Sequence, residues 1–114
     1  MLKKENRLTK RKEFGWVYKK GTSTFSKHIT LVTVPTKLKN PKFGFSISKK
    51  VGKAFQRNLL KRRLREIIKT YLPNINKNYN YVFIAKDSIN ALSFESLKQE
   101  IFYILSKSDK LINE

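Results

Sequence analysis

The sequence contains no cysteine, a single histidine and few acidic residues. Without cysteine, disulfide bonds, thiolate metal sites and a cysteine nucleophile are excluded. The histidine, His28, stands at the head of a strand-like segment, where an ordinary surface or strand-end residue is more common than a ligand. No acidic pair falls in a motif, so the side chains that usually hold a catalytic metal are not clustered in the sequence.

Two further segments fall short of catalytic motifs. Asp87 follows a strand-like segment, but a single carboxylate at that place is most simply a solvated loop residue. The segment KVGKA (residues 50–54) has one glycine, so it is better interpreted as a turn entering a helix than as a phosphate-binding loop. We therefore expect that any catalysis depends on a group that this chain does not itself supply.

Long apolar runs are also missing. The first 14 residues, MLKKENRLTKRKEF, contain no apolar stretch of the kind found in secretory signals. No run approaches the roughly 20 apolar residues needed to span a bilayer, and no lipidation motif accompanies the basic start of the chain. These absences predict a soluble, cytoplasmic protein.

What the sequence has in excess is positive charge. It carries 26 Lys and Arg against 8 Asp and Glu, a formal net charge of +18 over 114 residues. Self-repulsion of this size weakens a compact state unless a polyanion is at hand, and nucleic acid is the usual one. The hydrophobic share of 39% still suffices for a core, so we expect one domain over residues 1–114, with residues 1–8 flexible.

The positive charge is concentrated between residues 49 and 65. Eight of these seventeen residues are Lys or Arg, and none is acidic. Residues 54–71 have helical periodicity, with one apolar face formed by Leu60, Leu64, Ile67, Ile68 and Tyr71. The opposite face is cationic or polar and contains Asn58, Lys61, Arg62, Arg65 and Lys69. A solvated helix usually intersperses Glu among its Lys residues, whereas only Glu66 does so here, so the pattern favours a phosphate-binding surface.

The other segments complete an α+β pattern. A first helix is predicted from Thr9 to just before Gly21, with Phe14, Val17 and Tyr18 at helical spacing. Strands are predicted over 28–34, 43–48 and 81–86, with a short extra strand near 22–25, and a last helix after the N-cap Ser93. The order α-(short β)-β-β-α-β-α predicts a two-layer α+β sandwich, a small, mostly antiparallel sheet with three helices.

Alternation along the strands divides their residues between two faces. In the segment 43–48, Phe43, Phe45 and Ile47 share one face, while Gly44, Ser46 and Ser48 share the other. In the segment 28–34, the same rule separates two sets of three, Thr30, Val32 and Val34 against Ile29, Leu31 and Thr33. We therefore expect a sheet with one apolar face and one more open face.

The central segment FGFSISKKVGKAFQRNLLKRRLREI closely resembles the signature of the protein subunit of bacterial ribonuclease P. The matching positions are Ser46, Ser48, Lys49, Lys50, Gly52, Ala54, Arg57, Asn58, Lys61, Arg62 and Arg65. The N-terminal pattern fits as well, with Arg7-Leu8, Glu13-Phe14, Val17-Tyr18 and Lys20-Gly21. The resemblance covers nearly the whole chain, and its central motif is highly specific.

The resemblance implies a role in removing the 5′ leader from precursor tRNA, with the catalytic centre in an RNA that uses magnesium ions. The protein then has no catalytic residue and no metal site, and its partners are ribonuclease P RNA and precursor tRNA. The implied contacts with the catalytic RNA are Lys49, Lys50, Lys53, Arg57, Asn58, Lys61, Arg62 and Arg65. The implied cleft for the single-stranded leader is lined by Phe14, Tyr18, Thr30, Val32 and Ser46. The resemblance also implies a left-handed βαβ crossover, against the general right-handed rule.

One position departs from the family pattern. Leu59 stands where the signature has the second arginine of Arg-Asn-Arg, so one cationic RNA contact is expected to be absent or replaced by Arg63. Phe14 also has a competing interpretation as a core residue, and Tyr18, with its hydroxyl group, is the better candidate for a cleft residue. Neither a membrane nor an obligatory protein partner is expected, and dimerisation stays open.

Three other functions fit the composition less well. The main alternative is a ribosomal or ribosome-assembly protein, which would share the small size and high charge but lack the Ser-Lys-Lys to Arg motif. A DNA-binding regulator would need a helix-turn-helix, whereas strands flank the basic helix on both sides. A membrane-active cationic protein would need a lipid-facing surface rich in Trp and Phe, which the charged helix does not have.

Overall fold

The computed structural model describes residues 7–8, 11–37 and 41–111. The described residues form three α-helices and four strands in the order α1 (Arg11–Lys20), β1 (Thr22–Phe25), β2 (Ile29–Pro35), β3 (Phe43–Ser46), α2 (Ala54–Tyr71), β4 (Tyr79–Ala85) and α3 (Phe94–Lys107). Short 3-10 turns lie at Lys49–Val51, Leu72–Asn74 and Asp87–Ala91. The predicted α+β class and element order are confirmed. No described helix has both the length and the apolar character needed to cross a bilayer.

The four strands form one sheet in the order β1-β2-β4-β3. β1 pairs with β2 and β2 with β4 in antiparallel fashion, while β3 runs parallel to β4. The β3-α2-β4 connection is therefore a βαβ crossover between neighbouring strands, and its left-handedness stays a prediction. The open edges of the sheet are β1 and β3, so α2 follows directly from an edge strand.

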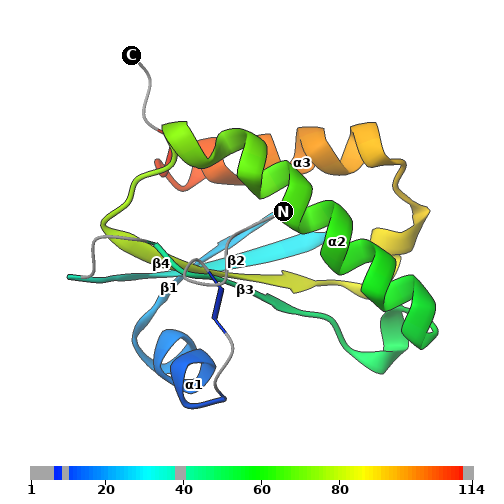
Figure 1. Ribbon diagram of the computed structural model, residues 1–114, viewed down its shortest axis with the longest axis horizontal. Coiled ribbons are helices and arrows are strands. Elements are labelled where there is room, and N and C mark those ends of the chain that lie inside the picture. Colours follow the sequence, from blue (N-terminus) through cyan, green and yellow to red (C-terminus); the bar gives the residue numbers. More distant parts are fainter. Residues whose placement is uncertain (1–6, 9–10, 38–40, 112–114) are drawn as a thin grey trace.

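Helices cover both faces of the sheet (Figure 1), with α2 and α3 on one face and α1 on the other. The α2–α3 side holds the main core, in which Ile29 and Leu31 of β2 pack with Phe43 and Phe83. The α1 side holds a smaller cluster formed by Leu8, Val17, Val32, Val34 and Val82. The alternation predicted for β2 is thus confirmed, and α1 adds a partial layer beyond the helices that cover the main core.

Stacked aromatic rings fix β3 to its neighbour β4. Phe43 faces Tyr81 with ring centroids 5.0 Å apart, and Phe45 faces Phe83 at 5.8 Å. Both pairs are direct partners in the β3–β4 register, so each adds a specific contact to the backbone ladder. The Tyr81 hydroxyl donates to the carbonyl oxygen of Asn76 at 2.5 Å, and burial, with a smaller contribution from Tyr79, raises its pKa.

Local hydrogen bonds and a proline account for the boundaries of the two long helices. The backbone N–H of Lys53 donates to Oε1 of Gln56 at 2.8 Å at the start of α2, and Pro73 follows just after its end. The backbone N–H of Ser96 donates to Oγ of Ser93 at 3.1 Å, which confirms Ser93 as the N-cap of α3. The predicted apolar face of α2 is also confirmed, with Leu60, Leu64, Ile67 and Ile68 buried.

Several sequence-based boundaries shift. β3 ends at Ser46 rather than Ser48, because the chain turns into the 3-10 segment at Lys49. β4 begins at Tyr79 rather than Tyr81, since Pro35 and Val34 of β2 extend the pairing to Tyr79 and Asn80. The predicted N-cap Thr9 lies outside the described residues.

Two residues expected to lie at the surface or to be flexible are instead packed. Leu8 falls in the segment expected to be flexible, yet it is only 6% exposed and its N–H donates to the Phe43 carbonyl oxygen at 2.8 Å. His28, expected to be an ordinary surface or strand-end residue, does stand directly before β2, but it is only 9% exposed, with Nδ1 2.6 Å from Oγ of Ser88. Its backbone N–H donates to the carboxylate of Glu100 at 2.7 Å. His28 therefore has a structural role in joining the start of β2 to α3.

Gly44 of β3 allows α1 to approach the sheet closely. A Cβ atom at this position would lie 2.6 Å from two carbons of the Phe14 ring and 3.1 Å from Cβ of Leu8. The absence of a side chain therefore lets the Phe14 ring lie directly over β3. Gly15 of α1 differs, because a Cβ there would meet nothing within 4 Å.

We predict that Gly44→Ala lowers the free energy of unfolding by about 1–3 kcal/mol, because the new methyl group displaces the Phe14 ring. Gly15→Ala is the matched control, and it should stabilise the helix by about 0.5–1 kcal/mol. Urea denaturation followed by circular dichroism measures both. An unchanged stability for Gly44→Ala would show that Phe14 is not held against β3.

Candidate RNA interface

A groove lies at the β3 edge of the sheet, between the start of α1 and the middle of α2. Its volume is about 330 Å³, and we call it the β3-edge groove. It is lined by Arg7, Leu8, Phe14, Phe43, Phe45, Lys61 and Arg65. Aromatic side chains thus form its apolar part, while the charges among its lining residues are all positive, a combination suited to a nucleic-acid strand.

Two cations of the groove, Lys61 and Arg65, come from one flank of α2, and Arg57 extends this row beyond the groove. Arg57, Lys61 and Arg65 are spaced four residues apart, so they follow one another along the helix beside its buried face. All three are half-buried. Asn58 and Arg62 are exposed and lie next to this row. The apolar packing of Leu64 and Ile68 against the sheet therefore fixes the direction in which these cations point.

Two of these guanidinium groups are partly desolvated. The Nε atoms of Arg57 and Arg65 are buried and make no hydrogen bond within the described residues. Burial, followed by the nearby positive charge of Arg7, lowers the pKa of Arg65. An unpaired buried donor costs stability.

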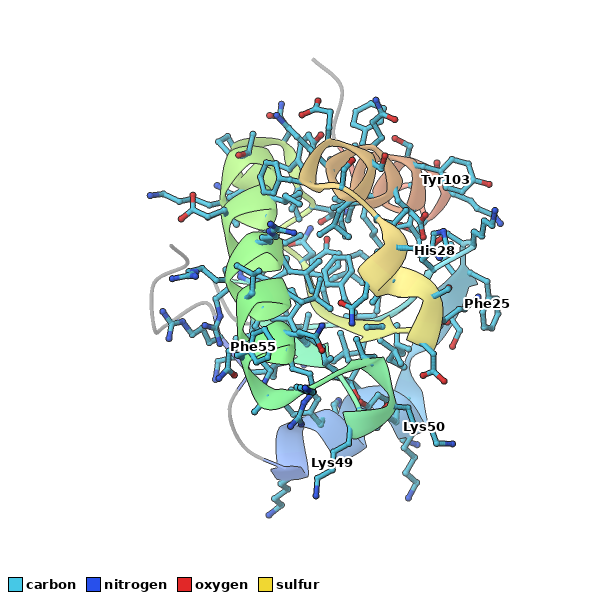
Figure 2. The ribbon with its side chains drawn as sticks, turned by 90° about the vertical axis from the view of Figure 1, so that its right-hand side faces the viewer. Phe25, His28, Lys49, Lys50, Phe55 and Tyr103 are labelled. Atoms are coloured by element: carbon cyan, nitrogen blue, oxygen red, sulfur yellow. The ribbon has the colours of Figure 1, made fainter. Side chains whose placement is uncertain are left out.

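The predicted cations before α2 lie apart from the groove. Lys49 and Lys50 are exposed in the 3-10 turn and extend outward near the N-terminal end of α2 (Figure 2). Lys53 is exposed at the N-cap of α2, where unsatisfied backbone N–H groups and the helix dipole also favour an anion. The eight predicted contacts therefore form two adjacent groups along one helix, a flank group and an N-terminal group.

Leu59 and Arg63 lie on the other flank of α2. They are one turn apart and line a hollow of about 170 Å³ together with Ile89, Asn90 and Leu92. Leu59 is 37% exposed and Arg63 is half-buried. Arg63 therefore occupies the same side of the helix as Leu59, which is compatible with the expected replacement of the missing arginine.

The residues predicted for the leader cleft lie on α1 and on the neighbouring part of the sheet. Strand register places Thr30, Ile84 and Ser46 side by side across β2, β4 and β3. All three are half-buried, and we call them the open sheet row. The next row, Val32, Val82 and Gly44, lies beneath α1. Val32 is only 4% exposed, so, unlike the other predicted cleft residues, it can support a ligand only from below.

Phe14 and Tyr18 form one side of α1. Their ring centroids are 6.3 Å apart in a tilted arrangement. Tyr18 is 46% exposed, whereas Phe14 is half-buried against the α1-side cluster and also reaches the β3-edge groove. Phe14 therefore packs as a core residue, one of its two interpretations, while it also lines the groove, and its role in a leader cleft stays a prediction; Tyr18 is the accessible ring.

Three residues of this region were not found from the sequence. Arg7 is brought to the groove by a single bridge to Phe43. Phe45 was placed on a buried face, but its position on an edge strand leaves it half-exposed in the groove. Ile84 lies between Thr30 and Ser46, and only the strand order could reveal this. The one signal in the sequence that could have pointed to these residues is the basic residues near Phe43-Gly44-Phe45.

Comparison with known proteins gives one consistent result. The Ribonuclease P family model matches residues 2–109. The Ribonuclease P protein component of Syntrophus aciditrophicus is 30% identical over 113 residues, covering 99% of this chain and 95% of the relative. That of Clostridium botulinum (strain Langeland) is 35% identical over 106 residues, covering 92% and 96%.

Solved structures agree with the sequence relatives. The RNase P protein of Staphylococcus aureus superposes with a TM-score of 0.87 at 28% identity, covering 95% of this chain and 98% of that one. The RNase P protein of Thermotoga maritima superposes with a TM-score of 0.82 at 25% identity, covering 89% and 96%. Fold, central motif and full-length similarity thus lead to one conclusion: this chain belongs to the ribonuclease P protein family, the protein component of an endoribonuclease holoenzyme.

Proposed function

We propose that this chain is the subunit that binds both the catalytic RNA and the single-stranded 5′ leader of precursor tRNA. The observation that carries the proposal is the row of cations on one flank of α2, two of which have buried Nε atoms that make no hydrogen bond in the part of the chain that the structure describes. This row lies beside aromatic rings in the β3-edge groove. Family membership favours this function over the alternative of a ribosomal or ribosome-assembly protein.

The catalytic RNA would contact the α2 cations. Lys61, Arg62 and Arg65, together with Asn58, present donors along about two turns of helix, and Lys49, Lys50 and Lys53 extend this surface toward the helix N-terminus. Each phosphate neutralised by a Lys or Arg releases counterions, so log affinity should fall with log salt by about 0.9 per contact in duplex regions. Assembly should therefore be strongly salt-dependent.

The leader would lie along the open sheet row and Tyr18. An exposed aromatic ring stacks on any base, at about 1–3 kcal/mol per base, which suits a leader whose sequence differs among tRNAs. Thr30 and Ser46 offer hydroxyl groups on the adjoining sheet row. Because mature tRNA has no leader, this contact favours the precursor over the product.

We propose that magnesium is bound mainly by the RNA partner. Among residues 7–8, 11–37 and 41–111, no three His, Cys, Asp or Glu side chains gather in one place, so this part of the chain does not fit an acidic metal site. The cations of α2 would instead screen repulsion between RNA segments. The protein should thereby lower the magnesium concentration that the holoenzyme requires.

We predict that Arg62→Ala and Lys61→Ala each weaken binding to ribonuclease P RNA and each lower the salt slope by about 1. Filter binding across a range of salt concentrations measures both quantities. Lys27→Ala, an exposed lysine in the β1–β2 turn, is the matched control and should change neither. Equal slopes for all three variants and the parent chain would contradict the α2 interface.

Tyr18→Ala should weaken binding of a precursor tRNA with a leader by about 1–3 kcal/mol, because one stacked base loses its ring. Binding of leaderless tRNA by the same reconstituted holoenzyme should not change. Equilibrium titration of both substrates gives the comparison. An equal loss for the two tRNAs would place Tyr18 outside the leader contact.

We expect Arg65 to lower the stability of the free protein while it contributes to RNA binding. Replacing it with Met removes a buried unpaired donor and a charge near Arg7 but keeps an apolar stem. We predict that Arg65→Met raises the free energy of unfolding by about 0.5–1 kcal/mol and weakens RNA binding. Arg62→Met, at an exposed position, should weaken binding without this stabilisation. Thermal melts of the two variants measure the change in stability. A lower melting temperature for Arg65→Met would show that Arg65 stabilises the free protein.

A further inference from the structure

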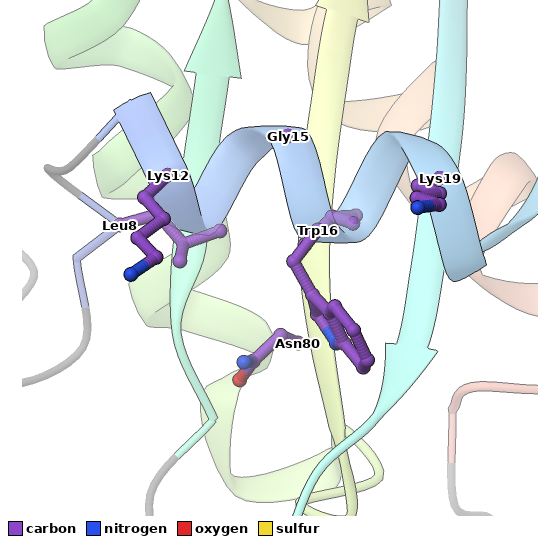
Figure 3. A pocket seen from close by; sticks show the side chains of 7 residues that line it. Leu8, Lys12, Gly15, Trp16, Lys19 and Asn80 are labelled. Atoms are coloured by element: carbon purple, nitrogen blue, oxygen red, sulfur yellow. The ribbon is translucent and has the colours of Figure 1, made fainter.

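The other side of α1 carries a pocket that the proposed RNA contacts do not use. It is lined by Leu8, Lys12, Gly15, Trp16, Val17, Lys19 and Asn80, and we call it the Trp16 pocket (Figure 3). Its volume of about 480 Å³ falls in the usual range for small-molecule sites, about 300–1,000 Å³. Trp16 and Tyr18 are two residues apart on a helix, so they occupy nearly opposite flanks of α1.

The pocket combines an exposed aromatic ring with positive charge. Trp16 is 56% exposed, and its side chain lies on the side of α1 where Asn80 of β4 is found (Figure 3). Lys12 and Lys19 are the charged residues of the lining, and Nζ of Lys20 lies 5.9 Å from the Trp16 ring centroid. Gly15 has no side chain, and nothing lies within 4 Å of where its Cβ would be, so α1 leaves the pocket open at this position.

Asn80 supplies a directed hydrogen-bond donor. Its Oδ1 accepts from the backbone N–H of Lys42 at 3.0 Å, which orients the carboxamide. Within the described residues the Nδ2 amide of Asn80 has no hydrogen-bond partner, and so it can donate to an incoming oxygen. Leu8 and Val17 of the same lining are buried and apolar, so the pocket joins apolar surface to the carboxamide of Asn80 and two lysines.

We propose that the Trp16 pocket binds an unpaired nucleotide of RNA, with the base stacked on Trp16 and phosphates beside Lys12 and Lys19. The charge favours this occupant, because the lining holds only positive charges and the whole chain carries +18. An acidic protein would match the charge but would not need a flat exposed indole beside it. The inference rests on the proposed function, since it adds a second RNA contact on the far side of α1.

Trp16 is the only tryptophan in the sequence, so its emission reports directly on this pocket. The probe is a pentauridylate labelled at its 5′ end, titrated into the full chain while label anisotropy and Trp16 emission are both recorded. We expect saturable quenching of Trp16 that follows the anisotropy curve. Trp16→Ala should weaken binding at least about five-fold, and Trp16→Phe should restore most of it.

Tyr103→Ala is the matched control. Tyr103 of α3 is a comparably exposed ring at 52%, with Nζ of Lys107 5.8 Å from its centroid, and α3 lies on the other face of the sheet from α1 (Figure 1). This variant should bind like the parent chain. Lys12→Ala and Lys19→Ala should each lower the salt slope by about 0.7, the value for one phosphate of a single strand.

The failures of the two proposals can be told apart. Binding of pentauridylate without any change in Trp16 emission, or an unchanged affinity for Trp16→Ala, overturns the pocket assignment while RNA binding stands. Emission that changes with protein concentration in the absence of RNA shows a second copy of the chain in the pocket and also overturns it. If neither pentauridylate nor ribonuclease P RNA binds, the proposed function fails along with the pocket.

Discussion

The packing of the apolar face of α2 on the sheet is the constraint on which the rest depends. Leu60, Leu64, Ile67 and Ile68 are buried against strands β3 and β4, and they fix the rotation of the helix about its axis. That rotation decides which way every Lys and Arg of α2 points. The free energy gained by burying four aliphatic side chains thus holds like charges together that would otherwise separate.

The helices and the strand faces could be predicted from the sequence because both follow from local periodicity. The 3.6-residue pattern of residues 54–71 and the alternation of Phe43 and Phe45 need no knowledge of distant segments. The central motif likewise predicts the row of cations on α2 from the sequence alone. Its strength lies in residues that are close together in the sequence.

Long-range neighbours could not be predicted in the same way. The contact of Leu8 with β3, the position of Ile84 between Thr30 and Ser46, and the burial of Val32 beneath α1 all depend on strand order and on where α1 crosses the sheet. His28 is a similar case, since its partners Ser88 and Glu100 are 60 and 72 residues away along the chain. No periodicity within one segment contains this information.

The placement of β3 at an open edge of the sheet has a consequence for solubility. An edge strand that carries Phe43 and Phe45 is a template on which another chain could add a strand and start an aggregate. Lys61 and Arg65 flank that edge, and the bridge from Arg7 occupies part of it. The positive charges that we propose to contact RNA would therefore also repel a second copy of the chain at this edge, so one set of residues would serve both solubility and recognition.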